Sequence, residues 1–265
     1  EVCQQCKPRF CTNGNANGWA CPYGLNTGEL SQNSDCGLCL ECVRSCTFKN
    51  VSVFSNKGLA APSARDMSEA WLSVAIFTTS VVYSFLYLGH WPVLRDYVNI
   101  LDKHNWNLFA RYSASFWMLT LVAVPSVLYL LAYTGKKISG ENESTKNIFL
   151  KNVTSLMPLG LALWIAFVVP MLFVNVTFIA QSLSDPFGWG WDFFGTANIP
   201  WQQFIPQYIP WIQAALVLAG LHFSLRNLSL MPKQLLMPSK ILLLRAPMAL
   251  FLIASAAGMM VFFTN

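Results

Sequence analysis

Hydrophobic residues dominate the chain after residue 67, where they gather into five stretches separated by polar links. Each stretch approaches the roughly 20 residues that a helix needs to cross a bilayer. We expect Pro158 and Pro170 to interrupt the third one. The stretches lie at about 69–89, 113–133, 156–181, 208–228 and 245–263. The pattern therefore predicts an all-α membrane protein with about five transmembrane helices.

The links between these stretches differ in charge, and the difference predicts an orientation. Two links are basic; they carry Lys136, Lys137, Lys146 and Lys151, and Arg226, Lys233, Lys240 and Arg245. The link at 182–207 has no Lys or Arg and contains Asp185 and Asp192. Short cytoplasmic loops are enriched in Lys and Arg. We therefore expect a bacterial inner-membrane protein with its N-terminal part on the cytoplasmic side and its C-terminus outside, although Arg95, Lys103 and Arg111 oppose this orientation mildly.

The link at 182–207 is also rich in Trp, Phe and Pro. An interfacial aromatic belt explains this composition, and a hydrophobic lid over a quinone, a pigment or a partner helix is the alternative. Within the spans, two pairs of small residues, Ala215 with Ala219 and Ala254 with Gly258, are spaced for close contact between helices.

Composition separates the chain into two parts. The chain is 54% hydrophobic and only 11% charged, whereas soluble domains carry about 25% charged residues. All eight cysteines lie between Cys3 and Cys46. We therefore predict a small, loop-rich, ferredoxin-like head at 1–67 and a membrane domain at 68–265. The net charge of +5 includes no basic run, which argues against a nucleic-acid partner.

Four of the cysteines, Cys36, Cys39, Cys42 and Cys46, have the spacing C-x2-C-x2-C-x3-C. Disulfides are disfavoured on the cytoplasmic side, and zinc sites usually separate two CxxC pairs by a dozen or more residues. The observed spacing is that of bacterial ferredoxins, in which three thiolates bind one [4Fe–4S] cluster and the fourth binds the other cluster. An iron–sulfur site is the strongest of the three interpretations.

A stretched version of the motif, C-x2-C-x4-C-x9-C-P, precedes it. We expect the insert between Cys11 and Cys21 to loop out, because Asn and Gly favour turns. The ferredoxin crossover then predicts two clusters. The first would be bound by Cys3, Cys6, Cys11 and Cys46, and the second by Cys21, Cys36, Cys39 and Cys42.

With these motifs, CQQCKPRFC and ACP upstream and CGLCLECVRSC downstream, the chain resembles the membrane-bound polyferredoxins. These proteins accompany periplasmic nitrate reduction, nitrous oxide respiration and photosynthetic cyclic electron flow. The resemblance is specific over about 50 residues. It implies two [4Fe–4S] clusters that relay electrons to or from quinone or a partner redox complex. It also implies other membrane subunits and a soluble electron donor as partners.

The histidines offer one further candidate site. His222 lies inside the fourth stretch with Arg226 four residues later, so the two share a helix face. Ionisable residues within a membrane are functional candidates, and this pair could bind a quinone. The alternative is a structural histidine and an arginine that extends to the headgroups. His90 and His222 fall near opposite surfaces, which argues against a haem bound by both.

Two other functions remain open from the sequence. A maturation factor would use its clusters to reduce a metal or thiol during assembly of another complex. A zinc-stabilised membrane scaffold would use the cysteines without redox chemistry. The sequence contains no nucleophile–base arrangement and no P-loop, so any enzymatic role would be that of an electron-transfer component.

Overall fold

The computed structural model describes residues 3, 5–30, 36–53, 63–64, 66–89, 96–230 and 238–264. The chain divides into two units, Glu1–Gly58 and Leu59–Asn265, which we call the head and the membrane unit. The division falls ahead of the boundary placed at residue 67 from the sequence. Ala64 explains the difference, because it is buried in the membrane unit and its N–H donates to the carbonyl of Leu150 at 3.1 Å.

The head contains little regular structure. Its helices are α1 (Phe10–Asn13) and α2 (Glu41–Ser45), and a single bridge pairs Asn15 with Gly18. Among its described residues only Gly18 and Ser45 are buried. The head is therefore loop-rich, as expected, and its described part has no buried apolar side chain. A ferredoxin-like arrangement stays a prediction.

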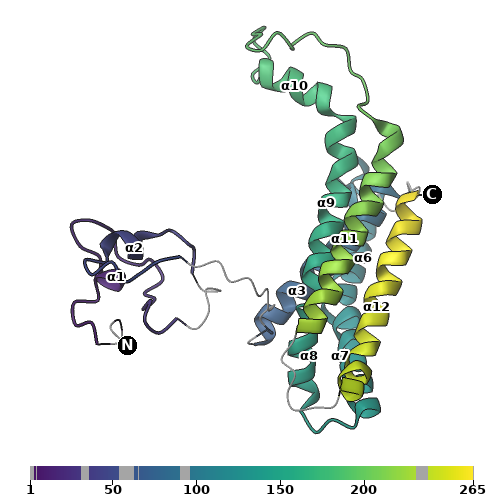
Figure 1. Cartoon of the computed structure of the whole chain (residues 1–265). Coiled ribbons are helices and arrows are strands. Elements are labelled where there is room, and N and C mark those ends of the chain that lie inside the picture. Colours follow the sequence, from purple (N-terminus) through teal and green to yellow (C-terminus); the bar gives the residue numbers. More distant parts are fainter. Residues whose placement is uncertain are drawn as a thin grey trace. The chain divides into compact units, whose positions relative to one another are not determined.

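The membrane unit is helical throughout its regular structure (Figure 1). Five of its segments are long and apolar enough to cross a membrane, which confirms the five predicted spans. The elements are α3 (Met67–Leu88), α5 (Ile100–Lys103), α6 (Trp106–Met118), the π-helix η1 (Leu119–Ala123), α7 (Val124–Ser139), α8 (Thr145–Val153), α9 (Leu156–Val174), α10 (Val176–Ser184), the 3-10 helix η2 (Pro206–Tyr208), α11 (Ile209–Leu230) and α12 (Pro238–Thr264).

Two observed helices differ from the predicted spans. The second span is longer than expected, because α6, η1 and α7 form one continuous segment. In the third span, Pro158 falls in the first turn and Pro170 lies within the helix, so neither interrupts α9. The helix ends at Val174 instead, where Asn175 leaves the helical region with φ −106° and its side chain donates to the carbonyl of Met171.

Helix α9 forms the centre of the bundle. It packs against α3 on one side and α11 on the other, while α12 packs against both α11 and α7. Side chains of α9 such as Leu156, Leu159 and Leu163 are fully buried in a single apolar core. Two hydrogen bonds fix the register of α9 on α11: the N–H of Leu159 donates to Ser224 at 3.0 Å, and Gln213 donates to the carbonyl of Ala166 at 2.8 Å.

Close contact between these helices depends on glycines that the sequence pattern did not single out. A Cβ on Gly220 would lie 2.5 Å from the Cβ of Ala162, and one on Gly160 would lie 3.0 Å from the Cα of Phe77. The predicted small-residue pairs are not in the core of the bundle. Ala215, Ala219, Ala254 and Gly258 are all exposed, and a Cβ on Gly258 would meet nothing within 4 Å, so their contact with helices outside this chain stays a prediction. Spacing alone does not say which face of a helix points inward.

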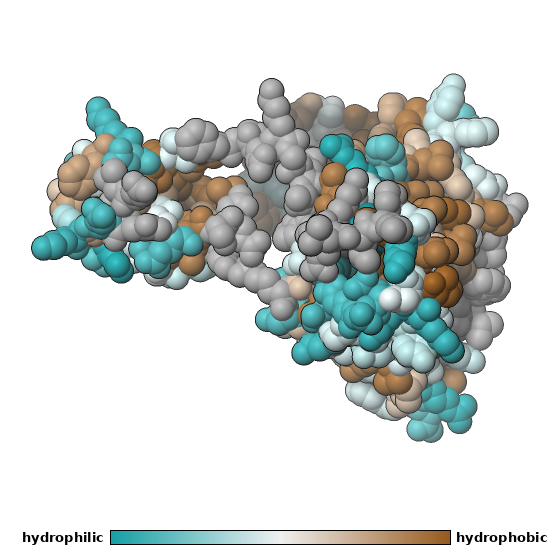
Figure 2. All heavy atoms as spheres, turned by 60° about the horizontal axis from the view of Figure 1, so that its bottom comes forward, coloured by the Kyte–Doolittle hydropathy of each residue, from teal (hydrophilic) through white to brown (hydrophobic). Residues whose placement is uncertain are grey.

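The two ends of the bundle differ in chemistry. The end where α3 begins and α7 leads into α8 carries the lysine-rich link, and we call it the basic end. Figure 2 looks toward this end and shows hydrophilic residues gathered there beside hydrophobic flanks. The opposite end carries α10, the loop after it and η2. We call this segment, residues 176–208, the aromatic module.

Candidate thiol sites of the head

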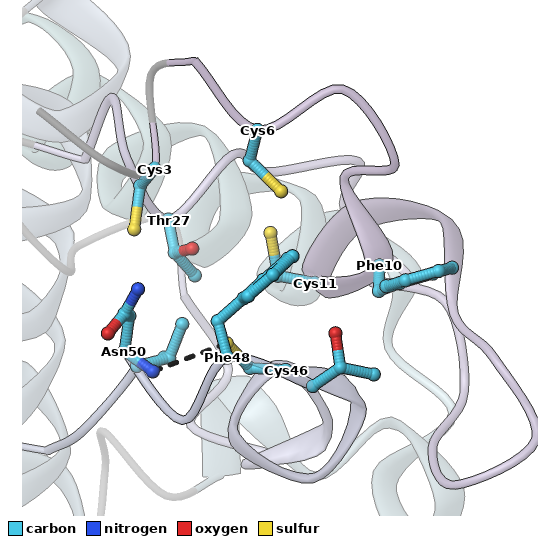
Figure 3. Close-up of a pocket in the computed structure, with 10 residues that line it drawn as sticks. Cys3, Cys6, Phe10, Cys11, Thr27, Cys46, Phe48 and Asn50 are labelled. Atoms are coloured by element: carbon cyan, nitrogen blue, oxygen red, sulfur yellow. Dashed lines mark hydrogen bonds between the residues drawn. The ribbon is translucent and has the colours of Figure 1, made fainter.

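The four cysteines predicted for the first cluster line one small cavity (Figure 3). Cys3, Cys6 and Cys11 come from the N-terminal segment, and Cys46 comes from the residue after α2. Thr27, Phe48 and Asn50 complete much of the lining. In the close-up the thiols of Cys6 and Cys11 point toward one another, and the hydroxyl of Thr27 lies among the thiols. Residues separated by more than 40 positions in the sequence therefore share one site.

Backbone geometry explains how these thiols are placed. Arg9 adopts a left-handed conformation with φ 44° and starts α1, which carries Cys11. Gly28 lies against Cys3 so closely that a Cβ at position 28 would be 2.7 Å from the Cβ of Cys3. The first thiol set (Cys3, Cys6, Cys11, Cys46) therefore requires a residue without a side chain at position 28.

Polar groups surround the sulfur atoms of the first set. The N–H of Asn50 donates to Sγ of Cys46 at 3.4 Å. Burial raises the pKa of Cys11, but polar groups of Thr27 and Thr12 outweigh it, and the pKa of this thiol is lowered overall. The Thr27 hydroxyl is buried and has no hydrogen-bond partner of normal geometry. It nevertheless lies close enough to Cys11 to lower the pKa of the Cys11 thiol. The polar groups of the site therefore stabilise the thiolate form of Cys11.

The second thiol set (Cys21, Cys36, Cys39, Cys42) is built differently. Burial raises the pKa of Cys42, and the neighbouring thiols of Cys36 and Cys39 raise it further, so these three sulfurs are electrostatic neighbours. The loop that carries them turns through Leu38 and Leu40, whose φ angles are 51° and 62°. Left-handed conformations cost about 1–2 kcal/mol for such residues. Strain of this kind is typical of segments shaped for a ligand.

Cys21 is brought to this loop through the residues after it. The ring of Tyr23 packs against Gly37, where an added Cβ would lie 3.0 Å from the ring. The N–H of Leu38 donates to Sγ of Cys36 at 3.4 Å. The segment that follows Cys21 thus lies beside the loop of Cys36 and Cys39, although the Cys21 thiol itself has no described contact with theirs.

The insert between Cys11 and Cys21 turns as expected, but it does not loop out. Asn15 donates to the carbonyl of Ser45 at 2.7 Å, and Gly18 is buried against the backbone of α2. The carboxylate of Glu41 accepts from the N–H of Trp19 at 2.9 Å, and this bond, together with the guanidinium of Arg44, lowers the pKa of Glu41. The insert therefore joins the two cysteine motifs.

The size of the first site tests which ligand fits it. The cavity has a volume of about 20 Å³, which is room for about one water molecule, so a four-iron cluster requires the lining to move outward. Phe48, which lines the cavity, is 58% exposed. Its side chain is not packed into a core, so it has room to move outward. Among the described residues, no group of three or more His, Cys, Asp or Glu is arranged to hold a metal ion. The donor set fits a cluster in its chemistry, with four thiols and sulfur-directed N–H groups.

The predicted quinone-binding pair lies on the membrane unit. His222 and Arg226 are both exposed on α11, near the basic end of the bundle. The ring of His222 lies edge-on to that of Phe223, with centroids 5.5 Å apart. These side chains therefore face outward from the bundle, and the quinone role stays a prediction. His90 lies outside the described residues.

Sequence analysis missed the polar and glycine residues around the sulfur atoms. Thr27, Gly28 and Gly37 belong to no cysteine spacing, and their contacts join positions far apart in the chain. The turn-forming NTG at 26–28 was the only available signal.

Comparisons with protein-family models, curated proteins and solved structures find no match to this chain. The resemblance to membrane-bound polyferredoxins therefore rests on the cysteine motifs and the helical spans.

Proposed function

We propose that the chain is a membrane-anchored electron-transfer subunit whose head binds two [4Fe–4S] clusters. One observation carries the proposal. The ferredoxin crossover predicts that Cys3, Cys6, Cys11 and Cys46 bind one cluster, and these four cysteines line one cavity. Cys46 lies 35 residues beyond Cys11, so no local spacing brings it there.

The described part of the head has no apolar core, which supports the same proposal. A unit of about 60 residues gains only marginal stability from hydrophobic burial, and natural proteins of this size often add disulfides, a metal or a similar support. All eight cysteines are free thiols. Binding of a metal group by thiolates supplies folding free energy directly. The bound clusters would therefore hold the head together as well as carry electrons.

Each residue around the sites has a role in this proposal. The cysteine thiolates bind iron. The N–H groups of Leu38 and Asn50 donate to ligand sulfurs, and such bonds tune reduction potential. When bound, each cluster supplies one-electron transfer. The protein fixes the clusters, limits solvent around them and anchors them beside the membrane.

A cluster is favoured over a single zinc ion by the spacing of the cysteines. Zinc sites usually separate two CxxC pairs by a dozen or more residues, whereas Cys36, Cys39, Cys42 and Cys46 follow one another with the ferredoxin spacing.

The basic links support a head on the cytoplasmic side. Short cytoplasmic loops are enriched in Lys and Arg, and the basic links lie at the same end of the bundle as the start of α3, which follows the head in the sequence. Electrons would then pass between a soluble or complex-bound donor and either quinone or a partner redox subunit. His222 and Arg226 face the surroundings of α11 and are the proposed contacts for quinone.

Iron and acid-labile sulfide analysis with low-temperature EPR of the reduced protein tests the proposal. We expect about eight irons per chain, from two four-iron clusters. A colourless protein with stoichiometric zinc or with disulfides among the eight cysteines would contradict it.

The quinone contact is tested separately. His222→Ala should leave both EPR signals unchanged and slow reoxidation of the reduced protein by added quinone, with exposed His104→Ala as the matched control. Equal rates in the two variants would remove His222 from the proposal. If quinone reoxidises neither variant nor the parent protein, the electrons pass to another protein, as in a maturation factor.

A further inference from the structure

The aromatic module is arranged with its polar side chains inside and its apolar side chains outside. On α10, Thr177, Gln181 and Ser184 share one face and bond the loop that follows. Thr177 bonds Gln202, Gln181 donates to the carbonyl of Ile199, and Ser184 donates to Asp192 at 2.7 Å. The other face carries Phe178, Ile179 and Leu183, all of which are exposed. A helix in water shows the reverse arrangement.

The loop after α10 is held in a defined shape by further hydrogen bonds. Both carboxylates are used internally, because Asp185 accepts from the N–H groups of Trp189 and Gly190, and Asp192 accepts from that of Ala197. The bond from Ser184 and those from the backbone lower the pKa of Asp192. The loop therefore uses both acidic side chains to hold its own shape.

Aromatic side chains cover the outside of this scaffold. Phe187 stacks on Trp189 with ring centroids 4.8 Å apart, and Trp191 lies edge-on to Trp189 at 4.8 Å. Trp189 is 67% exposed. The exposed set also includes Phe193, Phe194, Trp201, Phe204 and Tyr208. No Lys or Arg occurs between Lys151 and Arg226, so the surface offers no attraction to an acidic partner.

The register of the bundle places the module at the height of a membrane surface. Arg245 of α12 donates to the carbonyl of Ser229 at the end of α11, which marks a charged level at the basic end. From Ser229 to Ile209 is 20 residues, or about 30 Å of helix, and this equals the hydrocarbon thickness of a bilayer. Phe204 donates its N–H to the carbonyl of Phe173, so α10 begins one hydrocarbon thickness away. Figure 1 shows α10 turning across the axis of α9.

We propose that the aromatic module is a lipid-binding surface that lies in the headgroup layer, with α10 parallel to the membrane and its Phe178–Leu183 face toward the acyl chains. Trp and Tyr favour this layer because their rings combine an apolar body with a polar edge. Helices that lie in the interface bury their apolar face below the headgroups. The module would thereby fix the tilt and depth of α9 and α11, and its attachment would not depend on anionic lipid.

The test uses the full-length protein labelled with 5-fluorotryptophan in phosphatidylcholine bilayers. The ¹⁹F signals of Trp189 and Trp191 are assigned with Trp189→Phe and Trp191→Phe. We expect a lipid carrying a nitroxide near the headgroup to erase both signals, and a water-soluble paramagnetic chelate to leave them. Trp19, which is 81% exposed in the head, should show the opposite pattern and serves as the control. Adding phosphatidylglycerol should change neither result.

The proposal would be overturned if the aqueous chelate, and not the lipid nitroxide, erased the Trp189 and Trp191 signals. It would also be overturned if neither agent affected these signals, because that would indicate that a protein partner covers the module. The double variant Phe178→Ser/Leu183→Ser should reduce the effect of the lipid nitroxide, while Ser182→Ala on the exposed side of the same helix should not. The measurement on the parent protein decides the proposal even if the double variant fails to fold.

Discussion

The head and the membrane unit are stabilised by opposite means. The membrane unit buries a continuous apolar core along α9, with Leu156, Leu159 and Leu163 fully enclosed. In the described part of the head only Gly18 and Ser45 are buried, and hydrogen bonds between its two cysteine motifs replace packing. The comparison teaches that the bundle has an apolar core of its own, whereas the described part of the head has none and, under the proposed function, depends on the clusters that its thiols would bind.

The largest expected effect is unfolding of the head when the proposed clusters are removed. Treatment with an iron chelator and an oxidant should unfold the head, because in the proposed function cluster binding would supply its folding free energy. Amide exchange followed by mass spectrometry should then become complete across residues 5–53 and stay slow across α9. Retained protection in the head would break the comparison.

Single cysteine variants sharpen the comparison by separating the two sites. Cys11→Ser and Cys46→Ser should remove the same EPR signal, since both residues line one cavity, and Cys39→Ser should remove the other. Each variant should retain about four of about eight irons. Thr47→Ala in the lining should keep both clusters. Different signals lost in Cys11→Ser and Cys46→Ser would refute the predicted pairing.

The membrane unit should respond to packing changes that leave the head unaffected. Gly220→Val places side-chain atoms where a Cβ alone would lie 2.5 Å from Ala162. Overpacking of this kind costs about 1–3 kcal/mol. Thermal unfolding in detergent should show a lower midpoint, with unchanged iron content. Gly258→Val is the matched control, because position 258 has open space around it; an equal shift in both variants would refute the close α9–α11 contact.

A smaller effect is expected at Thr27, whose buried hydroxyl lies beside Cys11. Thr27→Val keeps the shape and removes the donor, so the first cluster should have a lower reduction potential. Redox titration followed by EPR measures the change, the second cluster serves as the internal reference, and Thr27→Ser should restore the potential. An unchanged potential in Thr27→Val would mean that the hydroxyl does not act on the site.

The smallest effect concerns the acid sensitivity of the head. The pKa of Glu41 is lowered in the folded head from its ordinary value of 4.5. A lowered carboxyl pKa adds stability above the unfolded-state value, and this stability is lost as the pH falls through the folded value. Glu41→Gln should therefore lose visible absorbance slightly faster than the parent at neutral pH, and the two should become equally fast only once the pH has fallen below the folded-state pKa of Glu41, which lies below 4.5. Parallel rates at every pH would show that the Trp19–Glu41 bond is not stabilising.

The sequence alone supported the five spans and the division into a head and a membrane part. Hydrophobic length is a local property, and a bilayer imposes it directly on each helix. The ferredoxin spacing also predicts the grouping of Cys3, Cys6, Cys11 and Cys46, which line one cavity, and their binding of one cluster stays a prediction. Helix boundaries are predicted less accurately than spans. The third apolar stretch predicts a span to residue 181, whereas α9 ends at Val174, because the side chain of Asn175 donates a hydrogen bond to the carbonyl of Met171.

Only the tertiary structure decided which residues act between distant segments. Gly220 meets Ala162, the insert residue Asn15 bonds Ser45, and Thr27 reaches Cys11 through contacts that no periodicity encodes. The inside-out face of α10 likewise appears only when the partners of Thr177, Gln181 and Ser184 are known. Local patterns determine what a segment can be, whereas non-local contacts determine which of its faces is used, because each contact depends on a partner placed by the rest of the fold.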